Sequence, residues 1–165
     1  MSDAPIDPAR FRQAMGRLAA GVTVLTTFAD GHDHAMTADT LTSVSLDPLL
    51  VLVCAEVETR WHDAVLEAGV FGASVLAADQ RPLSAWFATR GRPLHGQLDR
   101  APHHRGPATG VALLDGALTH LECRTTDIHP AGDHAIVVAE VLSIALPDTV
   151  GPALVHYRGS YGSIS

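Results

Sequence analysis

Residues 35–45 concentrate side chains that could do chemistry, since six of these eleven residues carry a hydroxyl or a carboxylate. After a turn at Asp47-Pro48 the chain enters the apolar run 49–55. A polar, β-branched segment that leads into a buried strand predicts a groove lined by hydroxyls, which suits a ligand with many hydrogen-bonding groups. The alternative is a polar edge strand whose Thr and Ser reflect β-propensity alone. From side-chain chemistry alone, the edge strand is the favoured interpretation.

Length and composition indicate one globular domain over residues 1–165, with a flexible N-terminus at 1–7. A hydrophobic fraction of 47% against a charged fraction of 18% argues against a disordered chain. The net charge is -7 and all 11 basic residues are Arg, so the clustered basic surface that nucleic acid requires is not expected. An anionic small ligand could bind only through locally placed Arg side chains or backbone N–H groups.

The two cysteines, Cys54 and Cys123, lie in apolar runs outside any metal-ligand spacing, which favours reduced, buried thiols. The N-terminus lacks the pattern of a signal peptide, and no apolar run approaches the length of a membrane span. We therefore expect a cytoplasmic protein with no membrane partner. The histidine pairs at 32/34 and 103/104 lack matched third and fourth ligands, so no metal site is expected.

Three helices are expected around these segments. The first begins at Asp7-Pro8 and ends at Gly21, the second spans 60–68 with Thr59 as its cap, and Asp79 caps the third. Apolar residues recur at helical spacing in each of them. These residues are Phe11, Met15, Leu18 and Ala19 in the first helix, Trp61, Val65 and Leu66 in the second, and Leu83, Trp86 and Phe87 in the third.

About seven strands complete the expected secondary structure, with a hairpin turn at Asp30-Gly31 and a second turn over 147–152. Gly and Pro interrupt residues 90–110, and a loop of this length is usually a functional cover or disordered. The spacing predicts a mainly β barrel with an N-terminal helix and short helical inserts. The expected strands are 22–28, 35–45, 49–55, 70–77, 113–126, 135–146 and 153–158.

Several short segments follow one another in an order that resembles the short-chain flavin reductases, from about residue 11 to 161. The segments are Phe11-Arg12-Gln13-Ala14-Met15-Gly16-Arg17-Leu18, Gly21-Val22-Thr23-Val24-Leu25-Thr26, Ala35-Met36-Thr37, Thr42-Ser43-Val44-Ser45-Leu46-Asp47-Pro48, Leu50-Val51-Leu52-Val53-Cys54, Ser74-Val75-Leu76, Gln80, Leu83-Ser84, Phe87-Ala88, Leu121-Glu122-Cys123, Gly132-Asp133-His134, Tyr157-Arg158-Gly159 and Tyr161. None is decisive alone, but the ordered set is a specific signal. The resemblance implies the FMN-binding split β-barrel, a mainly β fold of Greek-key type.

The resemblance also implies the activity of the family. Its members use NADH or NADPH to reduce FMN or FAD, and they deliver the reduced flavin to a partner monooxygenase. They are typically homodimers with the flavin near the dimer interface. The sequence leaves open the choice between FMN and FAD and between NADH and NADPH. A flavin-binding split-barrel protein without free-flavin turnover is the alternative, and a protein that keeps its flavin bound while it acts on another substrate is a weaker one.

The resemblance also implies site residues by position, with His134 as the catalytic residue near the nicotinamide. Thr37, Thr40 and residues 43–45 would contact the flavin, 55–60 would border its phosphate, and Ser74 its ribityl chain. The implied cofactor-binding residues are Thr37, Ala38, Asp39, Thr40, Ser43, Val44, Ser45, Ala55, Glu58, Thr59, Arg60, Ser74, Phe87, Arg90 and Tyr157.

Three places depart from the family pattern, and one of them is Ala73-Ser74-Val75-Leu76, where many members read Val-Asn-Val-Leu. Asp39-Thr40-Leu41 replaces the usual Ser-Ser-Phe or Asn-Ser-Phe, and an acidic residue there could point away, bind the pyrimidine N3–H or weaken flavin binding. The segment 89–93 replaces the usual Asp-Arg-Phe. Thr59 and Arg60 could bind a phosphate at a helix start, and Arg90 and Arg92 could reach a pyrophosphate. For Arg92, ordinary surface solubility is the favoured interpretation.

Overall fold

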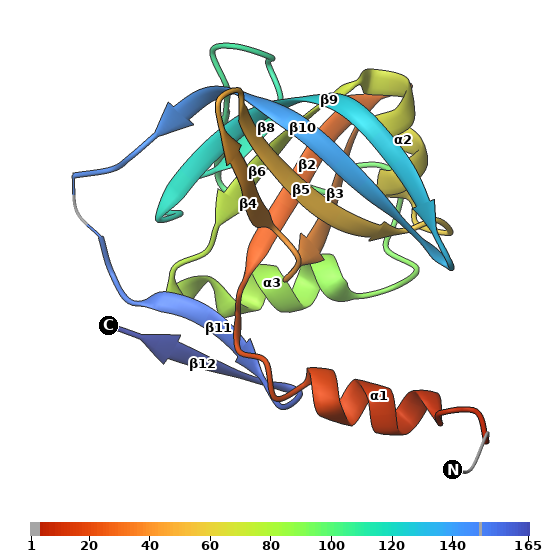
Figure 1. Cartoon of the computed structure of the whole chain (residues 1–165). Coiled ribbons are helices and arrows are strands. Elements are labelled where there is room, and N and C mark those ends of the chain that lie inside the picture. Colours follow the sequence, from red (N-terminus) through yellow and green to blue (C-terminus); the bar gives the residue numbers. More distant parts are fainter. Residues whose placement is uncertain (1–3, 149) are drawn as a thin grey trace.

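The computed structural model describes residues 4–148 and 150–165. Its main element is a seven-stranded sheet in which every ladder is antiparallel, with the order β3-β2-β6-β9-β10-β5-β4 (Figure 1). Among the described residues no ladder joins the edge strands β3 and β4, so the curved sheet stays open, which is consistent with a split barrel. The strands are β2 (Thr23–Ala29), β3 (His32–Ala38), β4 (Thr42–Leu46), β5 (Leu49–Glu56), β6 (Val70–Val75), β9 (Thr119–Ala131) and β10 (His134–Ala145).

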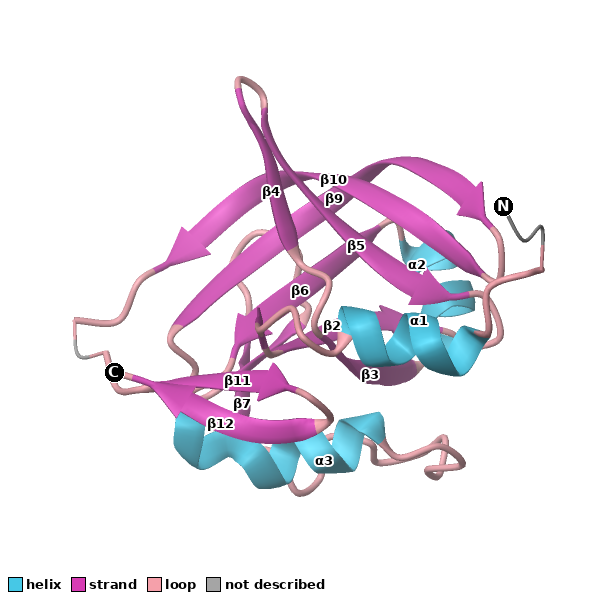
Figure 2. Ribbon diagram, turned by 60° about the horizontal axis from the view of Figure 1, so that its bottom comes forward, coloured by secondary structure: helices cyan, strands magenta, loops and turns pink. Residues whose placement is uncertain are grey.

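Smaller elements surround this sheet (Figure 2). The helices are α1 (Pro8–Met15), α2 (Arg60–Ala68) and α3 (Arg81–Ala88), with a 3₁₀ turn, η1 (Ala78–Gln80), before α3. β1 (Ala20–Gly21), β11 (Ala153–Tyr157) and β12 (Ser160–Ile164) form a three-stranded sheet, and β7 (His103–Arg105) pairs with β8 (Ala112–Leu114). No helix among the described residues is long and apolar enough to cross a membrane.

Two apolar clusters form the core, one on each face of β2. The first fills the barrel with residues such as Leu25 and Val53, and α2 contributes Trp61 to it. The second packs Val24 against Phe87 of α3 on the other face. Because β2 and β3 are adjacent strands of one sheet, packing on both faces of β2 places α2 and α3 around the end of β3.

Local sequence signals explain several boundaries. The Asp7 carboxylate accepts a hydrogen bond from the Ala9 N–H, as expected of a helix cap. Asp30 and Gly31 both adopt positive φ in the β2–β3 hairpin. The Thr59 hydroxyl accepts from the His62 N–H at the start of α2, and Gly69 ends that helix at φ 70. These expected turns and caps are confirmed.

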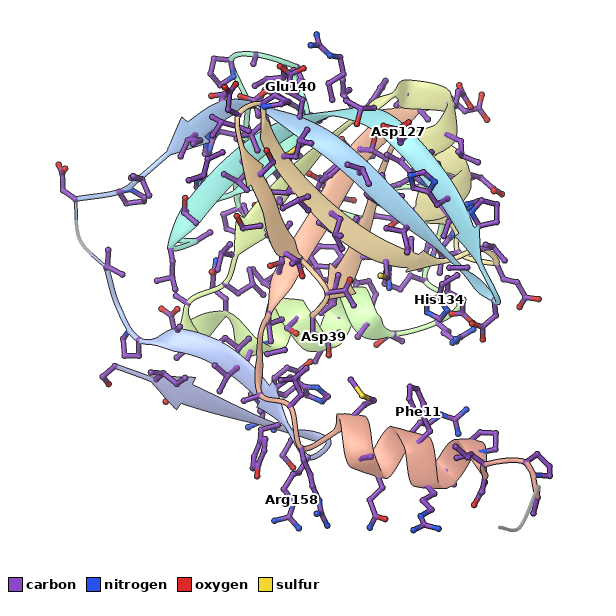
Figure 3. All side chains as sticks on the ribbon, in the orientation of Figure 1. Phe11, Asp39, Asp127, His134, Glu140 and Arg158 are labelled. Carbon is purple, nitrogen blue, oxygen red and sulfur yellow. The ribbon has the colours of Figure 1, made fainter. Side chains whose placement is uncertain are left out.

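The expected extent of the first helix is wrong. α1 ends at Met15 and none of its described side chains is buried, whereas the pattern extended it to Gly21. Gly21 instead pairs with Val155 of β11, so strand pairing competes with the helix at this point. Phe11 is 59% exposed and points from α1 toward the barrel in Figure 3.

Other boundaries also differ from the sequence prediction. The expected strand 35–45 is two strands, because the chain leaves β3 after Ala38 and crosses to β4 at Thr42. The expected strand 113–126 is divided between β8 and β9, the 90–110 loop contains β7, and β12 was not expected. Asp79 lies in the 3₁₀ turn, and Gln80 caps α3. The flexible segment expected at 1–7 and the turn expected at 147–152 lie partly outside the described residues, at 1–3 and at 149.

Candidate active site

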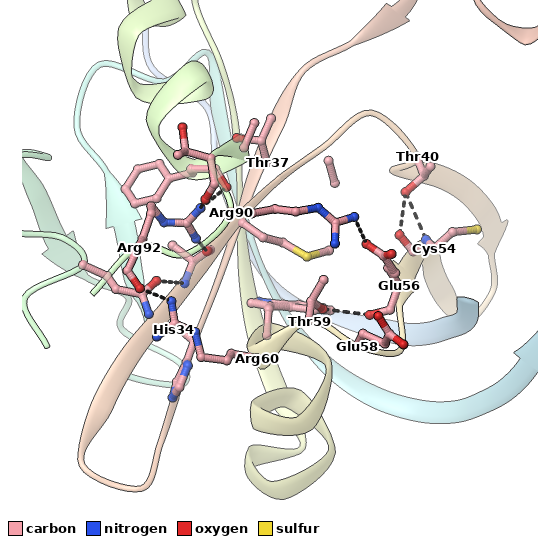
Figure 4. A pocket seen from close by; sticks show the side chains of 18 of the residues that line it. His34, Thr37, Thr40, Cys54, Glu56, Glu58, Thr59, Arg60, Arg90 and Arg92 are labelled. Carbon is pink, nitrogen blue, oxygen red and sulfur yellow. Dashed lines mark hydrogen bonds and ion pairs between the residues drawn. The ribbon is translucent and has the colours of Figure 1, made fainter. Parts of the chain in front are cut away.

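A cavity of about 520 Å³ opens at one end of the barrel (Figure 4). Its walls come from the end of β3, the link between β5 and α2, the C-terminal turn of α3 with residues 89–92, and the first residue of β10. Figure 3 places His134 of β10 and Asp39, which follows β3, at this same end. The predicted site residues that line the cavity are Thr37, Ala38, Asp39, Thr40, Glu58, Thr59, Arg60, Phe87, Arg90 and His134.

The four threonines of the cavity already donate their hydroxyl protons to the protein main chain, and Thr89 does so to the Ala85 carbonyl at 2.9 Å. The Thr37 hydroxyl donates to the Ser84 carbonyl at 2.7 Å, and the Thr40 hydroxyl donates to the Cys54 carbonyl at 3.2 Å. The Thr59 hydroxyl donates to the Glu56 carbonyl at 2.8 Å. A hydroxyl has one proton and two lone pairs. In this arrangement these oxygens can therefore accept from a ligand N–H or O–H, rather than donate to a ligand oxygen.

The three arginines of the cavity are held in different ways. Arg92 is half-buried and donates to the carbonyls of Ala35, Phe87 and Thr89, each at 2.6 Å. Burial lowers the pKa of this guanidinium, and the neighbouring charge of Arg60 lowers it further. Arg92 therefore fastens the loop after α3 to β3, and its interpretation as a solubilising surface residue is wrong.

Arg60 and Arg90 complete the cationic set. Arg60 donates to the carbonyl of Arg92, so it belongs to the same connection between α2 and the loop after α3. Arg90 reaches across the cavity to the Glu56 carboxylate, with 2.7 Å between the two side chains. The hydrogen bond and the charge of Glu56 raise the pKa of Arg90. The Arg90 side chain is 80% exposed, so this ion pair is what orients it.

Two histidines border the cavity in different environments. The Nδ1 atom of His134 lies 2.7 Å from the Asp133 carboxylate, and its side chain is 45% exposed. The pKa of Asp133 lies below its usual value because of this hydrogen bond and the charge of His134. His34 is buried, and burial lowers its pKa, which favours a neutral ring. Among the described residues, neither ring nitrogen of His34 has a hydrogen-bond partner.

Asp39 lies between the cavity and a smaller neighbour of about 200 Å³. One carboxylate oxygen of Asp39 is 3.5 Å from Nδ1 of His156 in β11. Ser84 and Tyr161, whose hydroxyls are 2.8 Å apart, line the smaller cavity. The Asp39 carboxylate is therefore directed to His156, which lines the smaller cavity and not the larger one.

Six of the expected site residues lie outside the lining of the larger cavity. Ser43, Val44 and Ser45 are on the edge strand β4, where Val44 is 48% exposed. Ala55 is fully buried in the barrel core. The buried Ser74 hydroxyl accepts from the Leu114 N–H at 3.0 Å, so it serves the core and not a ribityl chain. Tyr157 is at the end of β11.

The sequence prediction did not single out several residues that line the cavity. Alternation on β5 could have identified Cys54, because buried Val53 and Ala55 place Cys54 on the opposite face. His34, Trp61 and Gln97 gave no comparable local signal, because their positions depend on contacts far apart in sequence. The lining residues in question are His34, Ala35, Met36, Cys54, Trp61, Ala88, Thr89, Gly91 and Gln97, whereas Glu56 lies in the range 55–60 expected at the phosphate and Arg92 was expected within reach of a pyrophosphate.

The cavity suits a phosphate-bearing organic ligand of moderate size. Its volume lies within the roughly 300–1,000 Å³ typical of small-molecule sites. Arg90 offers a charge-assisted donor, and the threonine oxygens offer acceptors for ligand N–H and O–H groups. Unpaired buried polar atoms at the wall, the His34 ring nitrogens and Trp61 Nε1, indicate unused hydrogen-bonding capacity. This chemistry fits a flavin nucleotide.

Comparison with known proteins gives a match along most of the chain. Residues 15–165 match the model of a family described as the flavin reductase like domain. An NADH-dependent flavin reductase of Rhodococcus sp is 42% identical over 166 residues, which cover 98% of this chain and 89% of that protein.

Two solved structures share the fold along nearly the whole length of both chains. BorF, the flavin reductase component of a bacterial two-component tryptophan halogenase, gives a TM-score of 0.90 at 43% identity, covering 96% of this chain and 98% of that chain. The NADH:FAD oxidoreductase SgcE6 of Streptomyces globisporus, in complex with NAD and FAD fragments, gives 0.90 at 30% identity, with 98% and 97% covered.

Proposed function

This chain belongs to the family of flavin reductase-like domains, and from that premise we propose that it catalyses the NADH-dependent reduction of FMN or FAD. The observation that carries the proposal is the cavity of about 520 Å³, which gathers Thr37, Arg90 and His134 at one end of the barrel. It would act as a single domain and deliver reduced flavin to a partner monooxygenase.

Different residues of the cavity would bind different parts of the flavin. The threonine oxygens accept from the flavin ring N–H or the ribityl hydroxyls, since their own protons are already donated. Arg90 and the start of α2, which Thr59 caps, lie where a phosphate would find a cation and helix N–H groups. Phe87 and Ala88 at the end of α3 give this part of the wall an apolar surface.

His134 would be the residue nearest the reaction. A bound flavin supplies the redox chemistry, by accepting a hydride from the reduced nicotinamide. The protein must then hold two rings in contact and limit access of water. The Asp133 carboxylate orients the His134 ring at the cavity wall, where the ring could donate a hydrogen bond to either cofactor.

A homodimer would explain the partly exposed, apolar outer face of β5 and β10. On this face, Cys54 is paired with Ile136 and Leu52 with Val138, while the alternate residues Val53 and Val137 point into the barrel core. Figure 1 shows no helix over this part of the sheet. Monomers rarely expose contiguous apolar patches of this kind. The next paired positions are Glu56 and His134, so a second copy on this face would adjoin the cavity.

A cytoplasmic location is proposed from the cysteines. Cys54 and Cys123 are both free thiols, and burial raises the pKa of Cys123 to about 12, which keeps it protonated and unreactive. Reduced thiols are the normal state in a reducing compartment.

The test of function is a steady-state assay with purified protein. NADH absorbance should fall only when FMN or FAD is added, and the four flavin–nicotinamide pairs should rank the substrates. Binding of flavin without NADH or NADPH oxidation would support the alternative, a flavin-binding protein without turnover. Failure of both binding and turnover would rule out either function.

A further inference from the structure

Glu56 and Arg90 form an ion pair inside the cavity itself. Both residues line its wall, and their charged atoms are 2.7 Å apart. The Glu56 side chain is 28% exposed and the Arg90 side chain 80% exposed, so the pair faces the open space of the cavity. Figure 4 shows the two side chains reaching toward each other across it.

Arg90 is the least constrained of the three arginines in this wall. Arg92 is fixed by three main-chain carbonyls at 2.6 Å, and Arg60 donates to the carbonyl of Arg92. Arg90 alone pairs with a carboxylate through an exposed side chain. It can therefore turn to an incoming anion without breaking a contact that holds the fold together, whereas the other two arginines cannot.

We propose that Glu56 is an internal competitor for the phosphate of the ligand, and that it sets how tightly this site holds a phosphate-bearing cofactor. The inference rests on the proposed function. In the free protein the Glu56 carboxylate occupies the guanidinium of Arg90. A ligand phosphate has to displace that carboxylate, and Glu56 regains Arg90 when the ligand leaves. A reductase that must release its product benefits from such an exchange, because weak binding and rapid release go together.

The charges around the pair strengthen this argument. Glu58 also lines the cavity, and its charge acts on Arg90 in the same direction as that of Glu56. A phosphate that binds here therefore meets Arg90 when its charge is already balanced by nearby carboxylates. Charge-assisted hydrogen bonds from Arg to carboxylate and to phosphate are of similar strength, so the exchange is close to balanced.

The experiment compares FMN with riboflavin, which lacks the phosphate, by quenching of flavin fluorescence. Glu56→Gln should tighten FMN binding by about two- to fivefold, the range of an exposed ion pair, and should leave riboflavin unchanged. Glu67→Gln, an exposed residue of α2 outside the cavity, is the charge-matched control and should change neither. Weaker FMN binding in Glu56→Gln, or an equal shift for riboflavin, would overturn the proposal, and so would unchanged FMN binding together with an unchanged KM for NADH.

A second variant separates competition for Arg90 from a general effect of negative charge. Arg90→Gln should weaken FMN binding, and in that background Glu56→Gln should have no further effect because the contested cation is gone. If Glu56→Gln tightens FMN equally with and without Arg90, the competition does not exist.

The phosphate could belong to the flavin or to the nicotinamide nucleotide. The KM for NADH and that for reduced nicotinamide riboside, which has no phosphate, distinguish the two. A Glu56→Gln effect confined to FMN assigns Arg90 to the flavin phosphate, and one confined to the KM of NADH assigns it to the pyrophosphate. No effect on either overturns the inference while leaving the proposed function intact. If the wild-type protein neither binds nor reduces flavin, both the inference and the proposed function are wrong.

Discussion

The side chains at the cavity wall use much of their hydrogen-bonding capacity on the protein itself. Thr37 donates to Ser84, which is 47 residues away, and Arg92 donates to Ala35, 57 residues away. The residue types at 37, 40 and 59 could be predicted as site residues from the resemblance. The direction in which each hydroxyl proton points could not be predicted, because it depends on carbonyls that only the fold brings near.

His134 offers a direct test of the proposed reaction. His134→Ala should lower kcat by about 10- to 100-fold, because the loss of one positioning group misaligns the two rings, while the Kd for FMN changes by less. The measurements are steady-state kinetics and fluorescence titration on the same preparation. His104→Ala, at an exposed position of β7 outside the cavity, is the matched control and should match wild type. An equal loss of kcat and flavin affinity would assign His134 to binding.

Arg92 should prove to be structural. Arg92→Met removes charged hydrogen bonds to four carbonyls, three at 2.6 Å and that of Trp86 at 3.3 Å, so the free energy of unfolding should fall by about 2 to 3 kcal/mol. Urea denaturation followed by circular dichroism measures this loss. Arg10→Met on α1, where the side chain is exposed, should change stability by less than about 0.5 kcal/mol. Comparable stability of the two variants would mean that Arg92 does not fasten the loop.

Among the elements, the regular strands and capped helices were the predictable part. Alternation of buried and open positions marks β5, and the Thr59 and Gly69 signals bound α2. The break between β3 and β4 was not predictable, because residues 39–41 have the same polar, β-branched character as the strands on either side. What divides them is tertiary: β3 pairs with β2, and β4 pairs with β5.

The long loop over 90–110 is ordered partly by a carboxylate from β9. Glu122 is 1% exposed and accepts hydrogen bonds from the Ala108 and Thr109 N–H groups and from the Thr109 hydroxyl. Burial alone raises the pKa of Glu122, but these hydrogen bonds outweigh it, so its pKa lies below the usual value. An ionised Glu122 therefore binds this end of the loop to the sheet.

The pH dependence of stability follows from that shift. A group whose pKa is lowered in the folded state contributes stability above its unfolded pKa and loses it as the pH falls through the folded pKa. Glu122→Gln should cost about 2 kcal/mol at neutral pH. The difference from wild type should shrink as the pH falls below about 4.5. Thermal unfolding from pH 7 to pH 3 measures it, with Glu67→Gln at an exposed position of α2 as control. If the difference in stability between wild type and Glu122→Gln does not decrease in acid, Glu122 is not ionised in the folded protein.

For the whole molecule, the mainly β fold followed from the spacing of apolar strands and turn residues, and the ordered resemblance gave its type. The three-stranded sheet could not be derived in the same way. It joins β1, near the N-terminus, to β11 and β12 near the C-terminus. A two-residue strand such as β1 has no periodicity to detect, and its pairing partner lies more than a hundred residues along the chain.

The partly exposed, apolar outer face of β5 and β10 predicts the state of the protein in solution. Wild type should elute as a dimer of 17.4 kDa chains in size-exclusion chromatography with light scattering. Leu52→Glu places a charge in the centre of this face, where burial against a second copy would be costly, so the variant should be a monomer. Leu66→Glu, at a 49% exposed position of α2, is the matched control and should remain a dimer. Because Glu56 and His134 border the same face, the monomeric variant should also bind FMN more weakly than the control. If the Leu52→Glu variant is still a dimer, the dimer interface lies on another face of the protein. If wild type is a monomer, the proposed dimer does not exist.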